Sequence, residues 1–233
     1  MKNKKLLILF SAIFFVIEAI LGYYIQITVY PEVNHLQFFS IVLACAFCFL
    51  FAEKSKAYAF TQLALLFTVG ADYFLAYHFI PIQLQGMLCF SVVQTMYFLR
   101  LYSDDDNEKR KRVHLISRIS ISAVAMIATL LVLGKAADAV AVISVFYYAN
   151  LVLNLVFAFI QFKKAYLLAI GFIFFILCDT AIGLICLFPY LPIPDDSFIY
   201  KIQYAEFNIA WAFYIPSQIL LAMSLLPKRL RRT

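Results

Sequence analysis

The chain has 233 residues, of which 65% are hydrophobic and only 14% are charged, and it carries a formal net charge of +6 at pH 7. A typical soluble domain is about 45–50% apolar and about 25% charged. These values exclude a soluble enzyme, a disordered chain and a nucleic-acid-binding domain. They predict an all-α integral membrane protein in which nearly every residue lies in or beside a bilayer span.

Eight segments are apolar enough to cross a bilayer, because a spanning helix needs about 20 mostly apolar residues. The first is too long for a cleaved signal peptide and lacks a small-residue cleavage site, so we expect a retained anchor. The sequence therefore predicts one polytopic membrane domain, 1–233, with eight transmembrane helices. In chain order these cover residues 5–29, 36–52, 57–77, 81–101, 114–133, 138–161, 165–188 and 203–226.

The distribution of Lys and Arg predicts the orientation. With eight spans, only Lys135 and Lys201 fall on one side of the membrane, and the other 17 of the 19 basic residues fall on the opposite side. Such an excess marks the cytoplasmic side. Both termini are therefore expected in the cytoplasm, with the bacterial plasma membrane as the expected location. The positive net charge is explained by this topology, and we expect no nucleic-acid partner.

Two acidic residues lie at matched depth inside predicted spans. An ionisable side chain there costs on the order of 2.5–3.5 kcal/mol, so it is a candidate functional residue. Asp72 in the third span and Asp179 in the seventh both lie roughly 21–23 Å from the cytoplasmic boundary at about 1.5 Å per residue. This match suggests a four-plus-four internal repeat. Glu18, in the first span, has no obvious basic partner, and Glu206 lies near the outer end of the eighth.

Polar and aromatic side chains recur at helical spacing in spans three, four, six and eight, which predicts stripes that face the bundle interior because lipid cannot satisfy them. One interpretation is a polar binding site, and the other is hydrogen-bonding between helices without further function. Arg118, near the cytoplasmic end of span five, is expected to extend toward the headgroups. The candidate binding residues are Gln94, Tyr97, Tyr147, Asn150, Tyr214 and Gln218.

The five cysteines all lie in apolar runs and are interpreted as small buried hydrophobic residues. Their spacing matches no metal-binding or disulfide pattern. No His, Cys and Asp grouping suits a tight metal site, so we expect neither a metal nor another cofactor. The cysteines are Cys45, Cys48, Cys89, Cys178 and Cys186.

Four short motifs follow one another from the third span to the eighth. They are Gly70-Ala71-Asp72, then Gly86, Phe90, Gln94 and Tyr97, then Gly171, Phe175 and Cys178-Asp179, and finally Tyr214 and Gln218. Their order and spacing resemble those of the YhhN-like lysoplasmalogenase family of eight-span membrane proteins. This chain has Gln94 where that family usually has His, Cys178 where it usually has Ser, and one extra residue between Gly70 and Asp72.

The resemblance implies a hydrolase that cleaves the vinyl ether of a lysoplasmalogen into an aldehyde and a glycerophospho-alcohol. Its partner would be a membrane lipid or lysophospholipid substrate. Vinyl ether hydrolysis needs a protonated acid and a negative charge near the resulting cation. Glycosidases solve the analogous problem for glycosidic bonds with two carboxyl groups. Asp72 and Asp179 are the candidate catalytic pair, and the six binding candidates would position water and glycerol oxygens. The alternatives are a small proton-coupled transporter and a non-catalytic lipid-binding protein.

Overall fold

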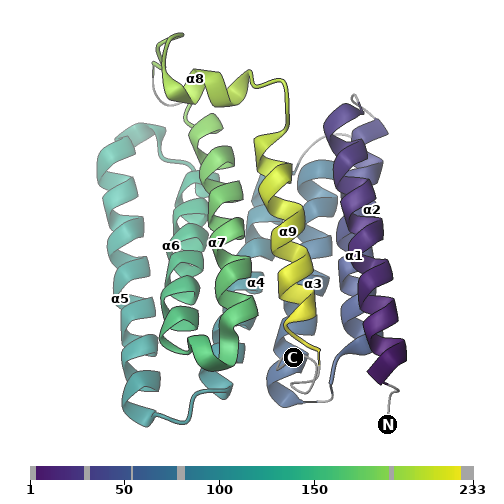
Figure 1. Ribbon diagram of the computed structural model, residues 1–233. Helices are drawn as coiled ribbons and strands as arrows, with labels where there is room; N and C mark the ends of the chain where they lie inside the picture. Colours follow the sequence, from purple (N-terminus) through teal and green to yellow (C-terminus); the bar gives the residue numbers. More distant parts are fainter. Residues whose placement is uncertain (1–3, 29–31, 54, 78–81, 189–191, 227–233) are drawn as a thin grey trace.

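Every regular element is helical in the computed structural model, which describes residues 4–28, 32–53, 55–77, 82–188 and 192–226. The long helices run side by side in a bundle, and the short α8 crosses one end of it (Figure 1). The elements are α1 (Lys4–Ile27), α2 (Glu32–Phe51), α3 (Lys56–Asp72), the π-helical η1 (Tyr73–Tyr77), α4 (Gln83–Ser103), α5 (Glu108–Leu133), the 3₁₀-helical η2 (Gly134–Ala136), α6 (Ala139–Ile160), α7 (Phe162–Ile185), α8 (Phe198–Gln203) and α9 (Ile209–Met223).

Six of the described helical segments are long and apolar enough to cross a membrane, which identifies an integral membrane protein. They are Lys5–Ile27, Glu32–Phe51, Lys56–Tyr77, Glu108–Ala136, Ala139–Ile160 and Phe162–Ile185. The apolar helix α9 is shorter, and α4 contains three Gln residues and Arg100. Both nevertheless lie within the bundle, against α7 and α3 respectively (Figure 1). The six helices confirm the all-helical membrane class, whereas the count of eight spans stays a prediction.

Several predicted residues lie outside the part of the chain that the structure describes. Val29, the end of the first predicted span, and Pro81, the start of the fourth, are two of them. Six basic residues of the expected cytoplasmic side lie there as well, namely Lys2, Lys54, Lys228, Arg229, Arg231 and Arg232. The structure therefore describes only some of the 17 basic residues that are expected on the cytoplasmic side.

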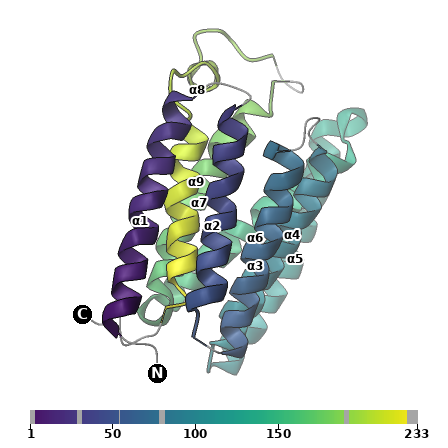
Figure 2. The same ribbon diagram turned by 90° about the vertical axis from the view of Figure 1, so that its right-hand side faces the viewer.

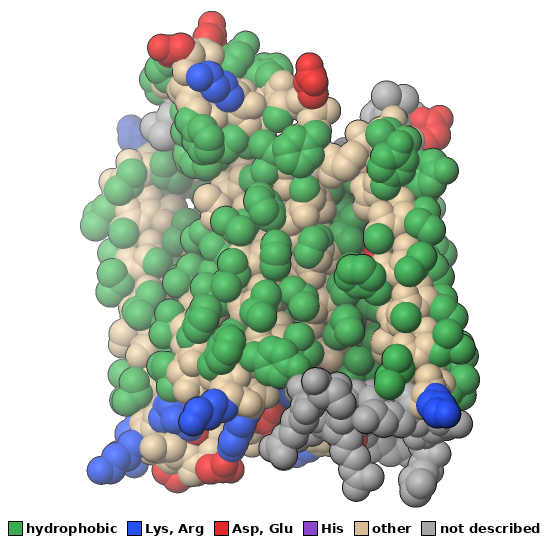
Figure 3. Space-filling model, in the orientation of Figure 1, with side chains coloured by type: hydrophobic (Ala, Val, Ile, Leu, Met, Phe, Trp, Pro, Cys, Tyr) green, Lys and Arg blue, Asp and Glu red, His purple; other side chains and the backbone are tan. Residues whose placement is uncertain are grey.

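Charge and apolar surface are separated along the bundle. Lys and Arg gather at one end, where α5 begins and α6 joins α7, while the middle zone of the visible face is mostly hydrophobic (Figure 3). Two apolar cores fill the interior, one among α3, α4, α6, α7 and α9 and the other among α1, α2, α3 and α9. In the second core, α1, α2 and α9 lie side by side (Figure 2). Helix α9 thus joins both cores.

The last long helix begins later than the expected residue 203. Helix α8 ends at Gln203, and α9 begins at Ile209 after an irregular turn. The Asn208 side chain caps α9 by accepting a hydrogen bond from the Trp211 backbone N–H at 3.2 Å. The Asn208 N–H in turn donates to Gln26 Oε1 at 2.8 Å, which ties this turn to α1. A capping residue and a contact far away in sequence therefore determine where the helix starts.

The predicted third span changes its helical form directly after Asp72. Residues Tyr73–Tyr77 form a π-helix, a wide turn that occurs frequently at functional sites. Leu75 in this segment packs against Gly86 of α4, where an added Cβ would lie 2.4 Å from Leu75 Cγ. A glycine at position 86 therefore allows α4 to approach the π-helix beside Asp72.

Substituting Gly86 by Ala should displace Leu75 and lower the melting temperature, because overpacking typically costs about 1–3 kcal/mol. Gly70→Ala is the matched control, since its added Cβ would meet Cys89 Sγ at an ordinary 3.8 Å. Thermal unfolding in detergent measures both variants. Equal melting temperatures for the two variants would contradict the close packing at Gly86.

The loop between α4 and α5 is held by a buried carboxylate. Asp105 accepts hydrogen bonds from the Arg110 guanidinium and, at 2.9 Å, from the Asn107 backbone N–H. Burial raises the pKa of Asp105, but these hydrogen bonds and the positive charge of Arg110 together bring it below its ordinary value. The neighbouring Asp106 is exposed and pairs with Lys164.

Asp105→Asn should lower the melting temperature at pH 7, because the native carboxylate is stabilised more in the folded state than in the unfolded state. A lowered pKa contributes stability above the ordinary value of about 4, and this stability is lost as the pH falls through the folded-state pKa. The difference in melting temperature between Asp105→Asn and the native protein should therefore become smaller below about pH 4. Asp106→Asn, at an exposed pair, is the control and should change little. If this difference in melting temperature did not change with pH, the charge of the Asp105 carboxylate would be excluded as its cause.

Candidate functional site

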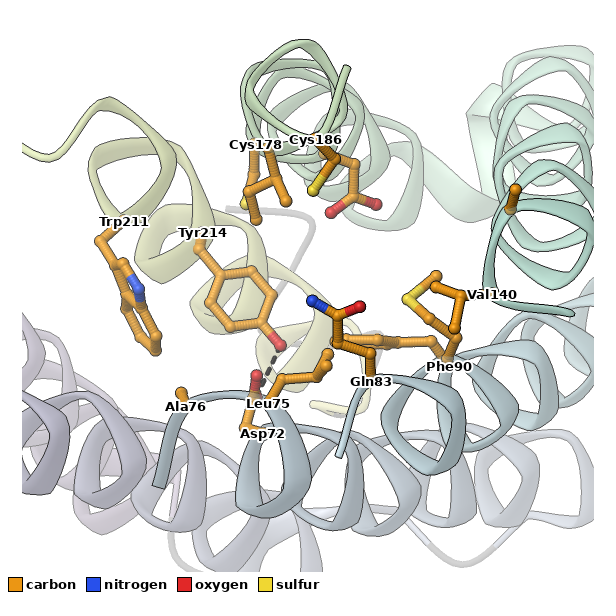
Figure 4. A pocket seen from close by; sticks show the side chains of 14 residues that line it. Asp72, Leu75, Ala76, Gln83, Phe90, Val140, Cys178, Cys186, Trp211 and Tyr214 are labelled. Atoms are coloured by element: carbon orange, nitrogen blue, oxygen red, sulfur yellow. Dashed lines mark hydrogen bonds between the residues drawn. The ribbon is translucent and has the colours of Figure 1, made fainter. Parts of the chain in front are cut away.

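A cavity of about 490 Å³ opens between five helices of the bundle, near the end where α8 lies. Its position follows from its lining, because Gln83 begins α4, Val140 lies in the first turn of α6 and Cys186 follows the last residue of α7 (Figure 4). Most of the lining is apolar, and its polar groups are few. The lining residues are Asp72, Leu75, Ala76, Gln83, Met87, Phe90, Val140, Ala141, Cys178, Asp179, Ile182, Cys186, Trp211 and Tyr214.

Asp72 is the last residue of α3, and it lines the cavity. Its side chain is buried, and the Tyr214 hydroxyl of α9 donates a hydrogen bond to its Oδ2 at 2.7 Å (Figure 4). The bond joins residues 142 positions apart in the sequence. A buried carboxyl group needs such a donor, because the surrounding apolar side chains offer none.

Asp179 reaches the same cavity from α7. The Tyr147 hydroxyl of α6 donates a hydrogen bond to Asp179 Oδ2. Tyr147 packs against Phe90, with ring centroids 5.4 Å apart, and so lies beside the cavity wall. The two acids selected from the sequence thus line one cavity, and each is oriented by a tyrosine from another helix.

The remaining predicted binding residues lie deeper in the bundle. Gln94, Tyr97, Asn150 and Gln218 are all buried, with exposed fractions of 0–1%, and none belongs to the cavity lining. We call Phe175 and its two aromatic neighbours in the lining, Phe90 and Tyr214, the aromatic floor of the cavity. In it, Phe175 contacts cavity residues on both sides, Phe90 at 6.0 Å and Tyr214 at 5.6 Å between ring centroids.

Arg118 lies inside the bundle rather than at the headgroup level expected from the sequence. Its guanidinium donates to Asn150 Oδ1 and Asn154 Oδ1, each at 2.5 Å, and stacks over the Phe98 ring at 4.4 Å. Asn154 Nδ2 then donates to Gln94 Oε1 at 2.9 Å. Two asparagine oxygens and an aromatic face hold the charge here, so it need not reach the headgroups.

Gln83, Met87 and Cys186 line the cavity but were not predicted as site residues from the sequence. A signal for two of them was present in α4, where Gln83 and Met87 continue the predicted stripe of Phe90 and Gln94 toward the helix start. Cys186 follows Cys178 and Ile182 at intervals of four residues, so helical spacing in the predicted seventh span was the signal for it. No grouping of three or more His, Cys, Asp or Glu side chains suited to a metal occurs in the described part of the chain.

The fold and the cavity define a class, an all-helical integral membrane protein with paired carboxyl groups in an intramembrane cavity. The chain belongs to the YhhN family, which it matches over residues 34–225. This match contains the π-helix, both carboxyl groups of the cavity and the two tyrosines that donate hydrogen bonds to them. No curated protein and no solved structure matches the chain.

Replacing Arg118 by Met should destabilise the protein strongly, because hydrogen bonds to charged groups contribute about 1.5–3 kcal/mol each and the two asparagine oxygens would lose their donor. Arg112→Met, at an exposed position of the same helix, is the control and should cost little. Melting temperatures of the purified proteins measure both. A stability loss no greater than that of the control would show that the buried network contributes nothing.

Proposed function

We propose that this protein is a lysoplasmalogenase-like hydrolase that cleaves the vinyl ether bond of a lysoplasmalogen inside the membrane. The observation that carries the proposal is that Asp72 and Asp179 line one largely apolar cavity. An apolar wall suits a lipid chain, and two carboxyl groups suit acid-assisted cleavage of an ether. Membership of the YhhN family is consistent with this activity.

The proposed reaction needs water and two carboxyl groups in different protonation states. One carboxylic acid transfers its proton to the β-carbon of the vinyl ether. This leaves an oxocarbenium ion, in which the α-carbon and the ether oxygen share the positive charge. The other group, as a carboxylate, stabilises this cation and accepts a proton from the water that attacks it. The resulting hemiacetal then breaks its bond to the glycerol oxygen. Its hydroxyl proton passes to the carboxylate left by the first step, and the other carboxyl group gives the proton it took from water to the glycerol oxygen. The products are an aldehyde and a glycerophospho-alcohol, and both acids recover their starting protonation states.

The two tyrosines position the acids in this proposal. Tyr214 donates to Asp72 and Tyr147 donates to Asp179, so each carboxyl group is held by a donor from a neighbouring helix. A fixed orientation helps catalysis, because a misplacement of about 1 Å can cost roughly 100-fold in rate. The two acids are held alike, so the proposal assigns the roles of acid and carboxylate to the pair.

The proposed topology has eight spans, with α4 and α9 added to the six qualifying helices, and both termini in the cytoplasm of a bacterial plasma membrane. Basic side chains gather at the end opposite the cavity, which supports this orientation (Figure 3). Similar pairings in the two halves support a four-plus-four repeat, since α3 packs on α4 as α7 packs on α9. The cavity would then lie toward the outer leaflet, with a lysophospholipid as its ligand.

A small proton-coupled transporter is the second candidate. The π-helix after Asp72 favours it, because interrupted helices often form the central sites of transporters. A third reading is a protein that binds lipid without turnover, which the glutamine at position 94 supports. Proton-coupled uptake into proteoliposomes distinguishes the transporter from the lipid binder, and turnover of a vinyl ether lipid distinguishes the hydrolase from both.

The test is aldehyde release from a lysoplasmalogen by the purified protein in detergent. Asp72→Asn and Asp179→Asn should each reduce turnover by about 100-fold or more, because general acid–base catalysis contributes about 10²–10⁴-fold. Glu206→Gln, an acid-to-amide change at an exposed position, should keep the native rate.

Melting temperatures establish that the variants are folded. Absence of turnover by the native protein on choline and ethanolamine lysoplasmalogens would overturn the hydrolase proposal. Turnover that survives both aspartate changes would overturn the paired-acid mechanism while leaving a hydrolase.

A further inference from the structure

Three buried polar side chains lie beneath the aromatic floor of the cavity: Gln94 and Tyr97 of α4 and Gln218 of α9. We call them the polar tier. Gln94 follows Phe90 by four residues, and Gln218 follows Tyr214 by four, so both lie about one helical turn below the cavity on the same helix faces.

Contacts of Tyr97 and Leu221 to α7 indicate the level of these side chains in the bundle. The Tyr97 ring meets Phe172 edge-on, with ring centroids 5.0 Å apart. The next residue toward the cytoplasmic end of α7, Gly171, lies against Leu221 of α9. Gln218 is one turn closer to the cavity than Leu221, at the height between Phe172 and the floor residue Phe175. Both helices therefore present polar groups to the same layer.

Four polar atoms of the tier have no hydrogen-bond partner among the residues that the structure describes. They are Gln94 Nε2, the Tyr97 hydroxyl, Gln218 Nε2 and Gln218 Oε1. Gln94 and Tyr97 have an exposed fraction of 0%, and Gln218 has 1%. A buried polar group without a partner costs about 1–3 kcal/mol, so four such atoms in one layer would be a heavy penalty.

The unpartnered atom of Gln94 is a donor because its neighbours fix the amide. Arg118 donates to Asn154 Oδ1, which leaves the Asn154 amide nitrogen to donate onward. That nitrogen donates to both the backbone oxygen and Oε1 of Gln94, at 2.9 Å each. Gln94 Nε2 is thereby left free to donate. The tier thus offers donors from α4 and both a donor and an acceptor from α9.

We propose that the polar tier binds ordered water, and that this water supplies the hydrolysis proposed for the cavity. Buried water typically makes about three hydrogen bonds to otherwise unsatisfied polar groups, and the tier offers four such atoms. The cavity lining is mostly apolar and offers few groups that bind water. The proposed reaction nevertheless consumes one water per turnover, so it needs a source of water nearby. The supply role rests on the proposed function, but water binding by the tier does not.

X-ray radiolytic labelling in ¹⁸O-water tests the water site directly, because hydroxyl radicals formed from bound water modify adjacent side chains even where bulk solvent cannot reach. Tyr97 should gain ¹⁸O despite its complete burial. Phe47, which is buried in the other apolar core, is the matched control and should stay unlabelled. A Tyr97 signal no higher than that of Phe47 would overturn the water site.

Gln94→Met combined with Gln218→Met removes the polar partners at similar side-chain length. Tyr97 labelling should then fall to the Phe47 level, and kcat should fall by roughly 10–100-fold with KM unchanged, because the tier does not contact the lipid. Gln161→Met, a buried glutamine at the cytoplasmic end of α6, is the control and should retain labelling and rate.

The outcomes separate the two proposals. A buried amide without a hydrogen-bond partner destabilises the protein, so its removal in Gln218→Met would raise the melting temperature if no water were bound. Such an increase, together with an unlabelled native Tyr97, would show that the tier binds no water and would overturn the inference. Labelled Tyr97 in a protein without turnover supports the water site and overturns only the hydrolase. Labelled Tyr97 with unchanged kcat in the double variant overturns the supply role.

Discussion

Inside an apolar bundle, a polar side chain can be satisfied only by another side chain, by the backbone or by bound water, since lipid offers no hydrogen bonds. This constraint explains the hydrogen bonds of the acids in helices α1, α3 and α7. Asp72 and Asp179 each accept from a tyrosine, and Glu18 accepts from Ser40 at 2.6 Å. Each bond joins two helices, so the same interactions that satisfy the acids also hold the bundle together.

The cavity depends on a second constraint, the close approach of helices beside Asp72. The π-helix Tyr73–Tyr77 widens the turn after this residue, and Gly86 allows Leu75 to pack against α4. A conventional helix would present different residues to the cavity, because a π-turn shifts every side chain that follows it. The position of Asp72 is therefore set jointly by local backbone geometry and by a contact with the next helix.

Arg118 shows how the two kinds of constraint combine. A charge in the bundle interior would ordinarily extend to the headgroups, but two asparagines on α6 offer oxygens at hydrogen-bonding distance. Their spacing of four residues places both amides on one face, where one planar guanidinium can donate to both. The network then orients Gln94, so a residue of α5 influences the layer beneath the cavity.

The sequence by itself determined the membrane class, because the apolar length of a span is a property of a single segment. It indicated the family through the order and spacing of four motifs, and it selected the two acids as candidates because a carboxyl group inside a span is costly. Two helix starts differ most from the expected ones: α5 begins at Glu108 instead of 114, and α9 begins at Ile209 instead of 203. The start of α9 was missed because it depends on the Asn208 cap and its bond to Gln26. Only the tertiary structure decided which tyrosine meets which acid and that Gln83 lines the cavity, whereas Gln94, Tyr97, Asn150 and Gln218 lie below it. Helical periodicity predicts which residues share a face of one helix. The rotation and depth of that face against other helices depend on packing between residues as many as 142 positions apart.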